Sequence, residues 1–275
     1  MAASGRQGSC SPSARRKKRL PRLTGDLWCP PSRSLNHEVL ATFSTLDRAF
    51  ACGGECITAS PISEVVRVSL GDKAYYVKKY WRRGKYLRRF LGRSRVRSEW
   101  ENLLFFQSLG IAVPRIVAYG EYGVLGRWHK KYQGILITEE VVGAEDLASM
   151  ASRNALGTQS SRWLKSVSKQ VAGAAARLHH QNFFHNDLKC RNILVTKTID
   201  PEVYLIDCPV GWRFPGYLLE RYKVKDIACL DKVARHHLSR TQRLQFFKMY
   251  RGKKKLDASD KRFLRKVVSF FDGRE

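Results

Sequence analysis

Four polar residues in the second half of the chain stand among apolar, strand-like runs at a spacing that could carry out a reaction. His185, Asp187 and Asn192 belong to the pattern H-x-D-L-K-x-x-N. Asp207 follows Asn192 by fifteen residues, at the end of the apolar run 203–206. Transfer of a phosphoryl group requires a side chain that orients the accepting hydroxyl and ligands that hold Mg²⁺ across the phosphates. Asp187 suits the first task, while Asn192 and Asp207 offer the oxygen ligands that this hard cation favours.

The same stretch contains Lys189, two residues after Asp187, where its ammonium group can reach a transferring phosphoryl group. Together these residues have the layout typical of a kinase catalytic loop followed by a metal-binding aspartate. A single aspartate in a loop is most often a turn residue, but four matched positions with strands around them make that interpretation the weaker one. Asp207 is followed by Cys-Pro-Val-Gly in place of D-F-G, so no switchable phenylalanine is expected.

Two strands and a helix must hold this loop in place. Residues 193–195 and 203–206 are short apolar runs on either side of Asp200-Pro201, which predicts a hairpin that fixes Asn192 and Asp207 on one side. Apolar residues at helical spacing predict a long helix over 161–182, and it ends just before the catalytic loop. The adjacent His179 and His180 are interpreted as packing or solvent residues, because a histidine pair without an acidic neighbour in the sequence is weak evidence for zinc.

A second constellation lies upstream, where residues 65–70 and 74–78 predict two strands joined by a Gly-Asp turn. Lys78 ends the second strand and is expected to contact the α- and β-phosphates of a nucleotide. A helix over 96–109 follows, and Glu99, four residues before an apolar position, is its candidate ion-pair partner for Lys78. Glu101 is the reserve candidate. A solvated helix face is the alternative interpretation for either glutamate.

The remaining nucleotide contacts are less clearly marked. No G-x-G-x-x-G occurs, so the phosphate-covering loop is assigned only to residues 58–63. The run 134–140 stands where a kinase hinge would be, which makes the backbone from Glu139 to Val141 the predicted contact for adenine. Asp146 is expected to cap the first helix of the second lobe. Asp226 is predicted to cap a later helix or to hold the backbone of the catalytic loop.

Composition limits the class of protein and of partner. The 275 residues include 51 Lys and Arg against 24 Asp and Glu, a formal charge of +27 that favours an anionic partner. Seven scattered cysteines fit a reducing compartment better than a disulfide framework, and Cys52 with Cys56 forms only a CxxxC, a weak signal for zinc. No apolar run is long enough for a transmembrane helix, and no apolar segment follows the basic N-terminus, which argues against secretion.

Cations and aromatic side chains alternate in two segments, 78–97 and 239–268. Such segments are most often solvated faces, but aromatic rings among cations also suit insertion at the headgroup level of an anionic membrane. Nucleic acid would accept the same composition through phosphate contacts and stacking. Residues 1–25 contain a run of five basic residues and little that could pack, so we expect a disordered basic arm.

Several of these segments together resemble one family. They are YYVKKYWRRGKYLRRFLGRSRVRSEWENL, SLGIAVPRIVAYGE, ILITEEVVGAEDL, HNDLKCRNILV, YLIDCPVGWR and KDIACLDK. The chain is similar here, over about residues 50–240, to the lipopolysaccharide kinase (Kdo/WaaP) family. The resemblance implies an α+β, protein-kinase-like fold of two lobes, a small β-rich N-terminal lobe with one helix and a larger, mainly helical C-terminal lobe.

The resemblance also implies a phosphotransferase that uses ATP and Mg²⁺, with an alcohol group as acceptor. The acceptor would be a Kdo or heptose sugar of the lipid A-linked core, at the cytoplasmic face of the inner membrane. With such an acceptor, nucleic acid is not expected to be a partner. By motif position, Lys78 and Glu99 would form the phosphate-binding pair, Asp187 would be the catalytic base, and Asn192 and Asp207 the metal ligands. The run after Asp207 departs from the family, which leaves the acceptor sugar open.

The lobes are assigned to residues 26–142 and 143–275, the second with a basic C-terminal extension. Two other functions stay open at this stage. One is a kinase of the same fold that acts on a protein or a small soluble metabolite. The other is a non-catalytic pseudokinase that binds an anionic surface. The absence of a Gly-rich loop favours it, and the presence of every motif acid counts against it. The oligomeric state and the number of Mg²⁺ ions are open as well.

Overall fold

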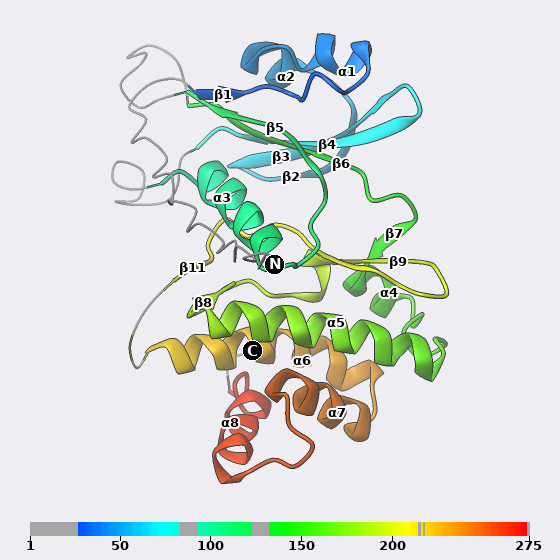
Figure 1. Ribbon diagram of the computed structural model, residues 1–275, viewed down its shortest axis with the longest axis vertical. Coiled ribbons are helices and arrows are strands. Elements are labelled where there is room, and N and C mark those ends of the chain that lie inside the picture. Colours follow the sequence, from blue (N-terminus) through cyan, green and yellow to red (C-terminus); the bar gives the residue numbers. More distant parts are fainter. Residues whose placement is uncertain (1–26, 83–92, 123–131, 214–215, 217, 274–275) are drawn as a thin grey trace, which may run out of the picture.

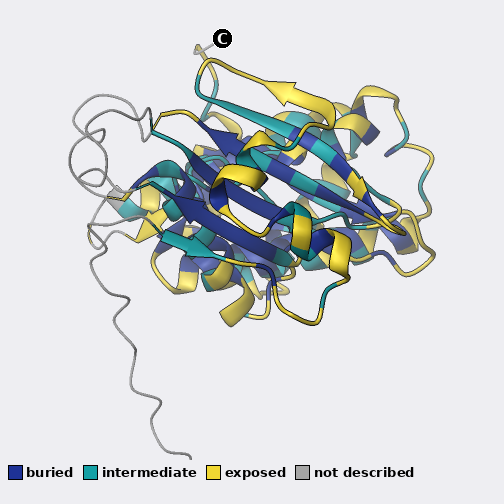
Figure 2. Cartoon of the chain, turned by 90° about the horizontal axis from the view of Figure 1, so that it is seen from above, coloured by how far each residue is buried: buried dark blue, intermediate teal, exposed yellow. Residues whose placement is uncertain are grey.

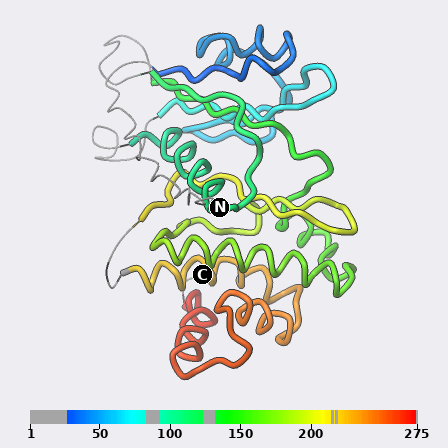
Figure 3. The backbone as a smooth tube through the Cα atoms, in the orientation of Figure 1, coloured from blue at the N-terminus to red at the C-terminus, as the bar shows by residue number. Residues whose placement is uncertain are grey.

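The computed structural model describes residues 27–82, 93–122, 132–213, 216 and 218–273. A sheet lobe lies above a lobe of helices, and the chain passes between them near residue 140 (Figure 1). Its path can be followed from the blue strands and helices of the first lobe to the red C-terminal helix (Figure 3). The predicted basic arm at 1–25 and residues 83–92 of the first basic and aromatic segment lie outside the described residues.

Six strands form the sheet of the first lobe, in the order β1-β5-β6-β4-β3-β2, with every neighbouring pair antiparallel. The predicted hairpin is confirmed: Leu70 pairs with Lys73 across a two-residue turn, whose Gly71 has the left-handed φ of +62° that glycine adopts without strain. The strands are β1 Leu27–Cys29, β2 Glu55–Ala59, β3 Ser63–Leu70, β4 Lys73–Tyr80, β5 Ile116–Glu121 and β6 Gly134–Glu139.

Helices cover both faces of this sheet. The short helices α1 (His37–Thr42) and α2 (Leu46–Ala51), which the sequence reading did not anticipate, pack on the outer face through a cluster that includes Phe43, Tyr75 and Ile137. Helix α3 (Arg95–Ser108) lies on the inner face, toward the second lobe (Figure 1). The central strands β4, β5 and β6 are largely buried, whereas the edge strand β2 is exposed along its length, as the colours of Figure 2 show.

The second lobe is built on two antiparallel helices of twenty residues, α5 (Ser161–His180) and α6 (Leu218–His237). Asp146 caps α4 (Leu147–Ser152), as predicted, by accepting hydrogen bonds from the amides of Ala148 and Ser149 at 3.0 and 2.9 Å. The other elements are β7 Ala144–Asp146, β8 Phe183–Phe184, the 3-10 turn η2 Cys190–Asn192, β9 Ile193–Thr196, β10 Val203–Leu205, β11 Trp212–Arg213, α7 Arg240–Arg251 and α8 Ala258–Val268.

One local prediction for this lobe was wrong. Asp226 does not cap a helix, because α6 begins at Leu218 and places Asp226 in its middle. The apolar pattern located the helix, but its start was misjudged because the sequence carries no clear start signal there. The last helix, α8, ends at Val268, and Phe270 lies in the turn beyond it.

The hairpin expected beside the catalytic loop is present. Strands β9 and β10 pair with Val203 opposite Val195 and Leu205 opposite Ile193, and β7 joins the other edge of β9. Among the described helices, none has the length and apolar content needed to cross a membrane. Because Ile193 at the start of β9 pairs with Leu205 at the end of β10, the catalytic loop and the Asp207 segment leave the same end of the hairpin, opposite its turn.

Candidate active site

Lys78 brings three segments of the chain together. Its Nζ atom lies 3.0 Å from Oε1 of Glu99 on α3 and 2.6 Å from Oδ1 of Asp207, which follows β10. The predicted ion pair with Glu99 is thus present. The reserve candidate, Glu101, pairs instead with Arg97, one turn before it on α3, and with Arg93, which precedes the helix.

Burial and charge set the protonation of this cluster. Burial alone would lower the pKa of Lys78, but the carboxylates of Glu99 and Asp207 outweigh it and hold that pKa well above its ordinary value. Burial raises the pKa of Glu99 against the attraction of Lys78. For Asp207 the effect of burial is outweighed by Lys78, and the pKa is lowered. The site therefore presents a fixed ammonium group and an ionised Asp207 at neutral pH.

Tyr80 is a member of the cluster that the sequence reading missed. Its hydroxyl donates a short hydrogen bond to Oε2 of Glu99, and the Lys78 ammonium lies 5.4 Å from the centre of its ring. Burial raises the pKa of Tyr80 well above its ordinary value, so the hydroxyl keeps its proton and remains a donor. The signal was its position two residues after Lys78, since alternate residues of a strand share one face.

The catalytic loop supplies the second half of the site. Asp187 accepts from Nζ of Lys189 at 2.5 Å, and Arg191 lies 3.7 Å from its other carboxylate oxygen. The side-chain nitrogen of Asn192 donates to the carbonyl of Asp187 at 2.9 Å and to its carboxylate at 3.3 Å. Asp187 is therefore held from three sides, with two cations placed next to the carboxylate that would meet the acceptor.

The structure brings Asn192 and Asp207 side by side. The amide of Ile206, next to Asp207, donates to the carbonyl of Asn192 at 3.0 Å, and Asp207 adopts a left-handed φ of +58°. Because the nitrogen of Asn192 faces Asp187, its oxygen is the atom left to bind a cation. In the described part of the chain no three His, Cys, Asp or Glu side chains gather as a metal site. One carboxylate and one amide oxygen nevertheless fit Mg²⁺, which usually keeps waters and substrate phosphates as its other ligands.

The backbone of the catalytic loop is fastened to α6 by Asp226. The fully buried carboxylate accepts from the amides of His185 and Asn186 at 2.7 and 2.8 Å. It also lies 3.2 Å from Nε2 of His179, whose Nδ1 is 2.8 Å from the hydroxyl of Tyr250 on α7. The second role predicted for Asp226, holding this backbone, is thus confirmed. Asp226 is also the acidic partner of His179, although the two residues are 47 positions apart in the sequence.

His185 itself serves the packing of the loop. Its ring is buried, stacks on Phe106 of α3 at 5.8 Å between ring centres, and neither ring nitrogen has a hydrogen-bond partner. Burial lowers its pKa, so the ring is neutral and acts as an aromatic contact between the lobes. The neighbouring Asn186, at a left-handed φ of +66°, accepts from Nζ of Lys225 at 2.6 Å.

In the predicted hinge segment, 139–141, some backbone groups already have hydrogen-bond partners within the protein. The amide of Glu139 donates to the carbonyl of Arg115, and the Glu139 side chain pairs with Lys73 at 2.6 Å. The carbonyl of Val141 accepts from the amide of Ala144. The contact of this segment with adenine stays a prediction, and the carbonyl of Glu139 and the amide of Val141 are the groups that fit it.

The predicted phosphate-covering segment 58–63 forms the turn between β2 and β3. The hydroxyl of Ser60 accepts from the amides of Ile62 and Ser63, at 3.3 and 3.1 Å. This turn is thus closed by its own hydrogen bonds, and its role in phosphate binding stays a prediction.

The chain was compared with known protein families and with solved structures, and both comparisons gave a match. The family model described as "Lipopolysaccharide kinase (Kdo/WaaP) family" matches residues 54–250. A solved structure of WaaP in complex with acyl carrier protein aligns with a TM-score of 0.64 and 20% identity, over 83% of this chain and 90% of that chain. Likeness at this identity shows a shared fold, and the predicted protein-kinase-like fold is confirmed. No curated protein matches the chain.

We predict that Asp226→Asn will loosen the catalytic loop. The change removes the charge from an acceptor of three buried hydrogen bonds, and such bonds contribute about 1.5–3 kcal/mol each. We expect a loss of at least about 2 kcal/mol in urea unfolding, with faster amide hydrogen exchange at His185 and Asn186. The control is Asp231→Asn, five residues along the same helix, which pairs with Arg243 at 2.6 Å. Equal effects of the two variants on exchange in the loop would contradict the assignment.

Proposed function

The chain belongs to the lipopolysaccharide kinase (Kdo/WaaP) family, and on that premise we propose that it transfers the γ-phosphate of ATP to a hydroxyl of Kdo or heptose in the inner core of lipopolysaccharide. The observation that carries the proposal is the meeting of Lys78, Glu99 and Asp207 within one hydrogen-bonded cluster beside the Asp187 loop. Family membership supports a phosphotransferase, while the donor, the metal and the acceptor hydroxyl belong to the proposal.

Each side chain has a task that follows from its position. Lys78, held protonated by two carboxylates, would bind the nucleotide phosphates, and Glu99 would keep its ammonium in place. Mg²⁺, bound by Asn192 and Asp207, would neutralise charge on the phosphates. Asp187 would accept the hydrogen bond of the attacking hydroxyl and orient it, and Lys189 would stabilise charge on the transferring group.

Two alternatives for the same chain remain open to experiment. A kinase of this fold could act on a protein or a soluble metabolite, and a non-catalytic member could bind an anionic surface without turnover. The complete set of Lys78, Asp187, Asn192 and Asp207 in bonding geometry favours an enzyme over the second alternative. The acceptor assay described below distinguishes a lipopolysaccharide kinase from a kinase that acts on a protein or a soluble metabolite.

We also propose that the protein works at the cytoplasmic face of the inner membrane, held by its cations to anionic lipid. The net charge of +27 supports this, as do exposed lysines at 253–255, between α7 and α8. Each cation near an anionic surface contributes about 1 kcal/mol of attraction, so a few such groups suffice for reversible binding.

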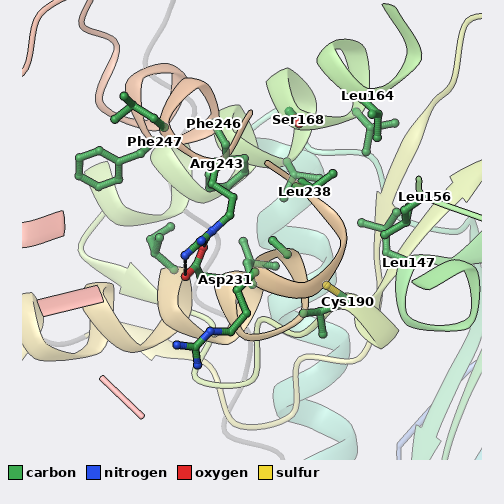
Figure 4. Close-up of a pocket in the computed structure, with 18 of the residues that line it drawn as sticks. Leu147, Leu156, Leu164, Ser168, Cys190, Asp231, Leu238, Arg243, Phe246 and Phe247 are labelled. Carbon is green, nitrogen blue, oxygen red and sulfur yellow. Dashed lines mark hydrogen bonds and ion pairs between the residues drawn. The ribbon is translucent and has the colours of Figure 1, made fainter. Parts of the chain in front are cut away.

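The solved structure of the neighbour is a complex with acyl carrier protein, and this supports the proposal of a second partner. We propose that an acyl carrier protein also binds this chain and places its acyl chain in an apolar cavity of about 450 Å³ in the helical lobe. The cavity lies between α5, α6, α7 and α8, and Leu147, Leu164, Leu238 and Phe246 point into it (Figure 4). Its polar lining comes from the Arg243–Asp231 pair together with Ser168, Arg235 and Arg240, and most of the other lining residues are apolar, as an acyl chain requires.

We predict that Asp187→Ala will abolish nearly all phosphate transfer while nucleotide binding is kept, because orientation of the hydroxyl matters mainly in the transition state. The measurement is transfer from labelled ATP with Mg²⁺ to purified, dephosphorylated lipopolysaccharide core. Asp207→Ala should lose transfer too. Asp200→Ala, an exposed aspartate in the β9–β10 turn, is the control and should retain it. Wild-type turnover in Asp187→Ala would remove the catalytic assignment, and ATP binding without transfer to core would indicate a different acceptor.

For membrane association, we predict that replacing Lys254 and Lys255 with Glu weakens binding to anionic vesicles, with a larger loss at low salt than at high salt. Arg88→Glu with Arg89→Glu tests the first basic segment in the same way. Lys165→Glu with Lys169→Glu, two exposed positions on α5, makes the same change in net charge and is the control. Equal losses in all three pairs would mean that net charge alone, and no particular segment, governs binding.

For the carrier protein, we predict that the acyl-loaded form binds this chain more tightly than the unloaded form. Ala234→Phe should abolish that difference, because the added ring occupies the cavity. Burial of each CH₂ contributes about 0.8 kcal/mol, so a chain of several carbons should give at least a tenfold preference in calorimetric titration. No preference by the wild-type protein would exclude the cavity as the acyl site.

A further inference from the structure

One buried amide, on Asn102, ties α3 to the segment that follows Asp207. Its Nδ2 atom lies 2.7 Å from the carbonyl oxygen of Cys208 and 2.9 Å from that of Gly211. Asn102 is only 4% exposed. Both neighbours are acceptors, so the atom that faces them must be the nitrogen, and its two hydrogens are used one on each carbonyl.

The segment that this amide holds is tightly folded. A Cβ atom on Gly211 would come within 2.4 Å of the Cys208 sulfur and 2.8 Å of the Phe183 ring, so only glycine fits there. The buried Cys208 thiol in turn contacts the carbonyl of His185 at 3.7 Å. Asn102 therefore closes a turn, 207–211, whose backbone carbonyls would otherwise be buried beside α3 without a donor.

The link completes a ring of side-chain contacts around Asp207. Asn102 and Glu99 lie one turn apart on the inward face of α3, with Glu99 bound to Lys78 and Lys78 bound to Asp207. The chain then returns from Asp207 through Cys208 to Asn102. Helix α3, strand β4 and the Asp207 segment are thus joined by two ion pairs and by two hydrogen bonds from the side-chain nitrogen of Asn102.

We propose that Asn102 is a positioning residue that keeps Asp207 in its metal-binding position by fixing the following turn to α3. The metal-binding role of Asp207 rests on the proposed function. The reason that an extra link is needed is competition for one carboxylate. Without a metal, the carboxylate of Asp207 pairs with Lys78. A cation bound to the same carboxylate would weaken that ion pair, and with it the hold of Lys78 on Asp207. The hydrogen bonds from Asn102 to the backbone carbonyls involve other atoms and would remain.

The position of Asn102 also explains how the chain manages without a phenylalanine after the metal-binding aspartate. In kinases with D-F-G, the packing of that ring sets the active or inactive placement of the aspartate. Here Cys208 occupies the position, and a small buried thiol cannot make the same set of contacts. The two hydrogen bonds of Asn102 take over the task, and they favour a single placement of Asp207 in which α3 and the turn stay together.

The test uses the full chain with Asn102→Leu, which removes the donor, and Asn102→Asp, which keeps the shape but turns oxygens toward the two carbonyls. The control is Gln170→Leu, because Gln170 on α5 likewise binds the backbone of the β9–β10 hairpin, at Pro201 and Val203. Two readouts are measured: amide hydrogen exchange over 207–213 without ligand, and calorimetric binding of a non-hydrolysable ATP analogue with Mg²⁺ and with EDTA.

In both Asn102 variants, exchange over 207–213 should rise about tenfold, the effect of leaving buried carbonyls unpaired. The tightening of nucleotide binding by Mg²⁺ should fall by a similar factor, while binding in EDTA stays unchanged. Gln170→Leu should alter neither. If the Asn102 variants keep wild-type exchange and wild-type Mg²⁺ dependence, the inference is overturned. If the wild-type protein shows no Mg²⁺-dependent nucleotide binding, the proposed function fails, and the role of Asn102 in metal binding fails with it.

Discussion

The ammonium group of Lys78, enclosed by the carboxylates of Glu99 and Asp207, is the interaction on which the rest of the structure depends. Removal of charges from water costs several kcal/mol per ion, and only close pairing with further hydrogen bonds offsets that cost. Here the offset comes from two short ion pairs and from the hydroxyl of Tyr80. Because the three charged groups come from β4, α3 and the segment after β10, a shift of any one of these elements breaks at least one ion pair of Lys78.

The second lobe meets a different constraint, the need to satisfy backbone groups in an irregular loop. The residues around Asp187 cannot use a helix or a sheet ladder, so their amides require partners from elsewhere. Asp226 provides one carboxylate for two of them, and His179 and Tyr250 extend the network to α7. The catalytic loop is thereby supported by the core of the helical lobe rather than by its own local structure.

One 3-10 turn, η2, connects the reaction centre with the interior of the helical lobe. Lys189 precedes this turn and Arg191 lies within it, and both cations lie next to the Asp187 carboxylate, where they suit the proposed anionic acceptor. Cys190 between them points the other way and lines the apolar cavity (Figure 4). The cations beside Asp187 and the lining of the apolar cavity are therefore adjacent along the chain, on opposite sides of one turn.

The sequence by itself determined the residues that are close along the chain or repeat at a regular period. The H-x-D-L-K-x-x-N spacing located Asp187 and Asn192, the alternation of 65–78 located the hairpin of Lys78, and the helical period placed Glu99. Only the tertiary structure decided which distant side chains complete the site. Asn102 reaches Cys208 across 106 positions, and Tyr250 reaches His179 across 71. No local propensity encodes such contacts, because they arise from the packing of whole helices against the loop and satisfy buried groups that have no partner nearby in the sequence.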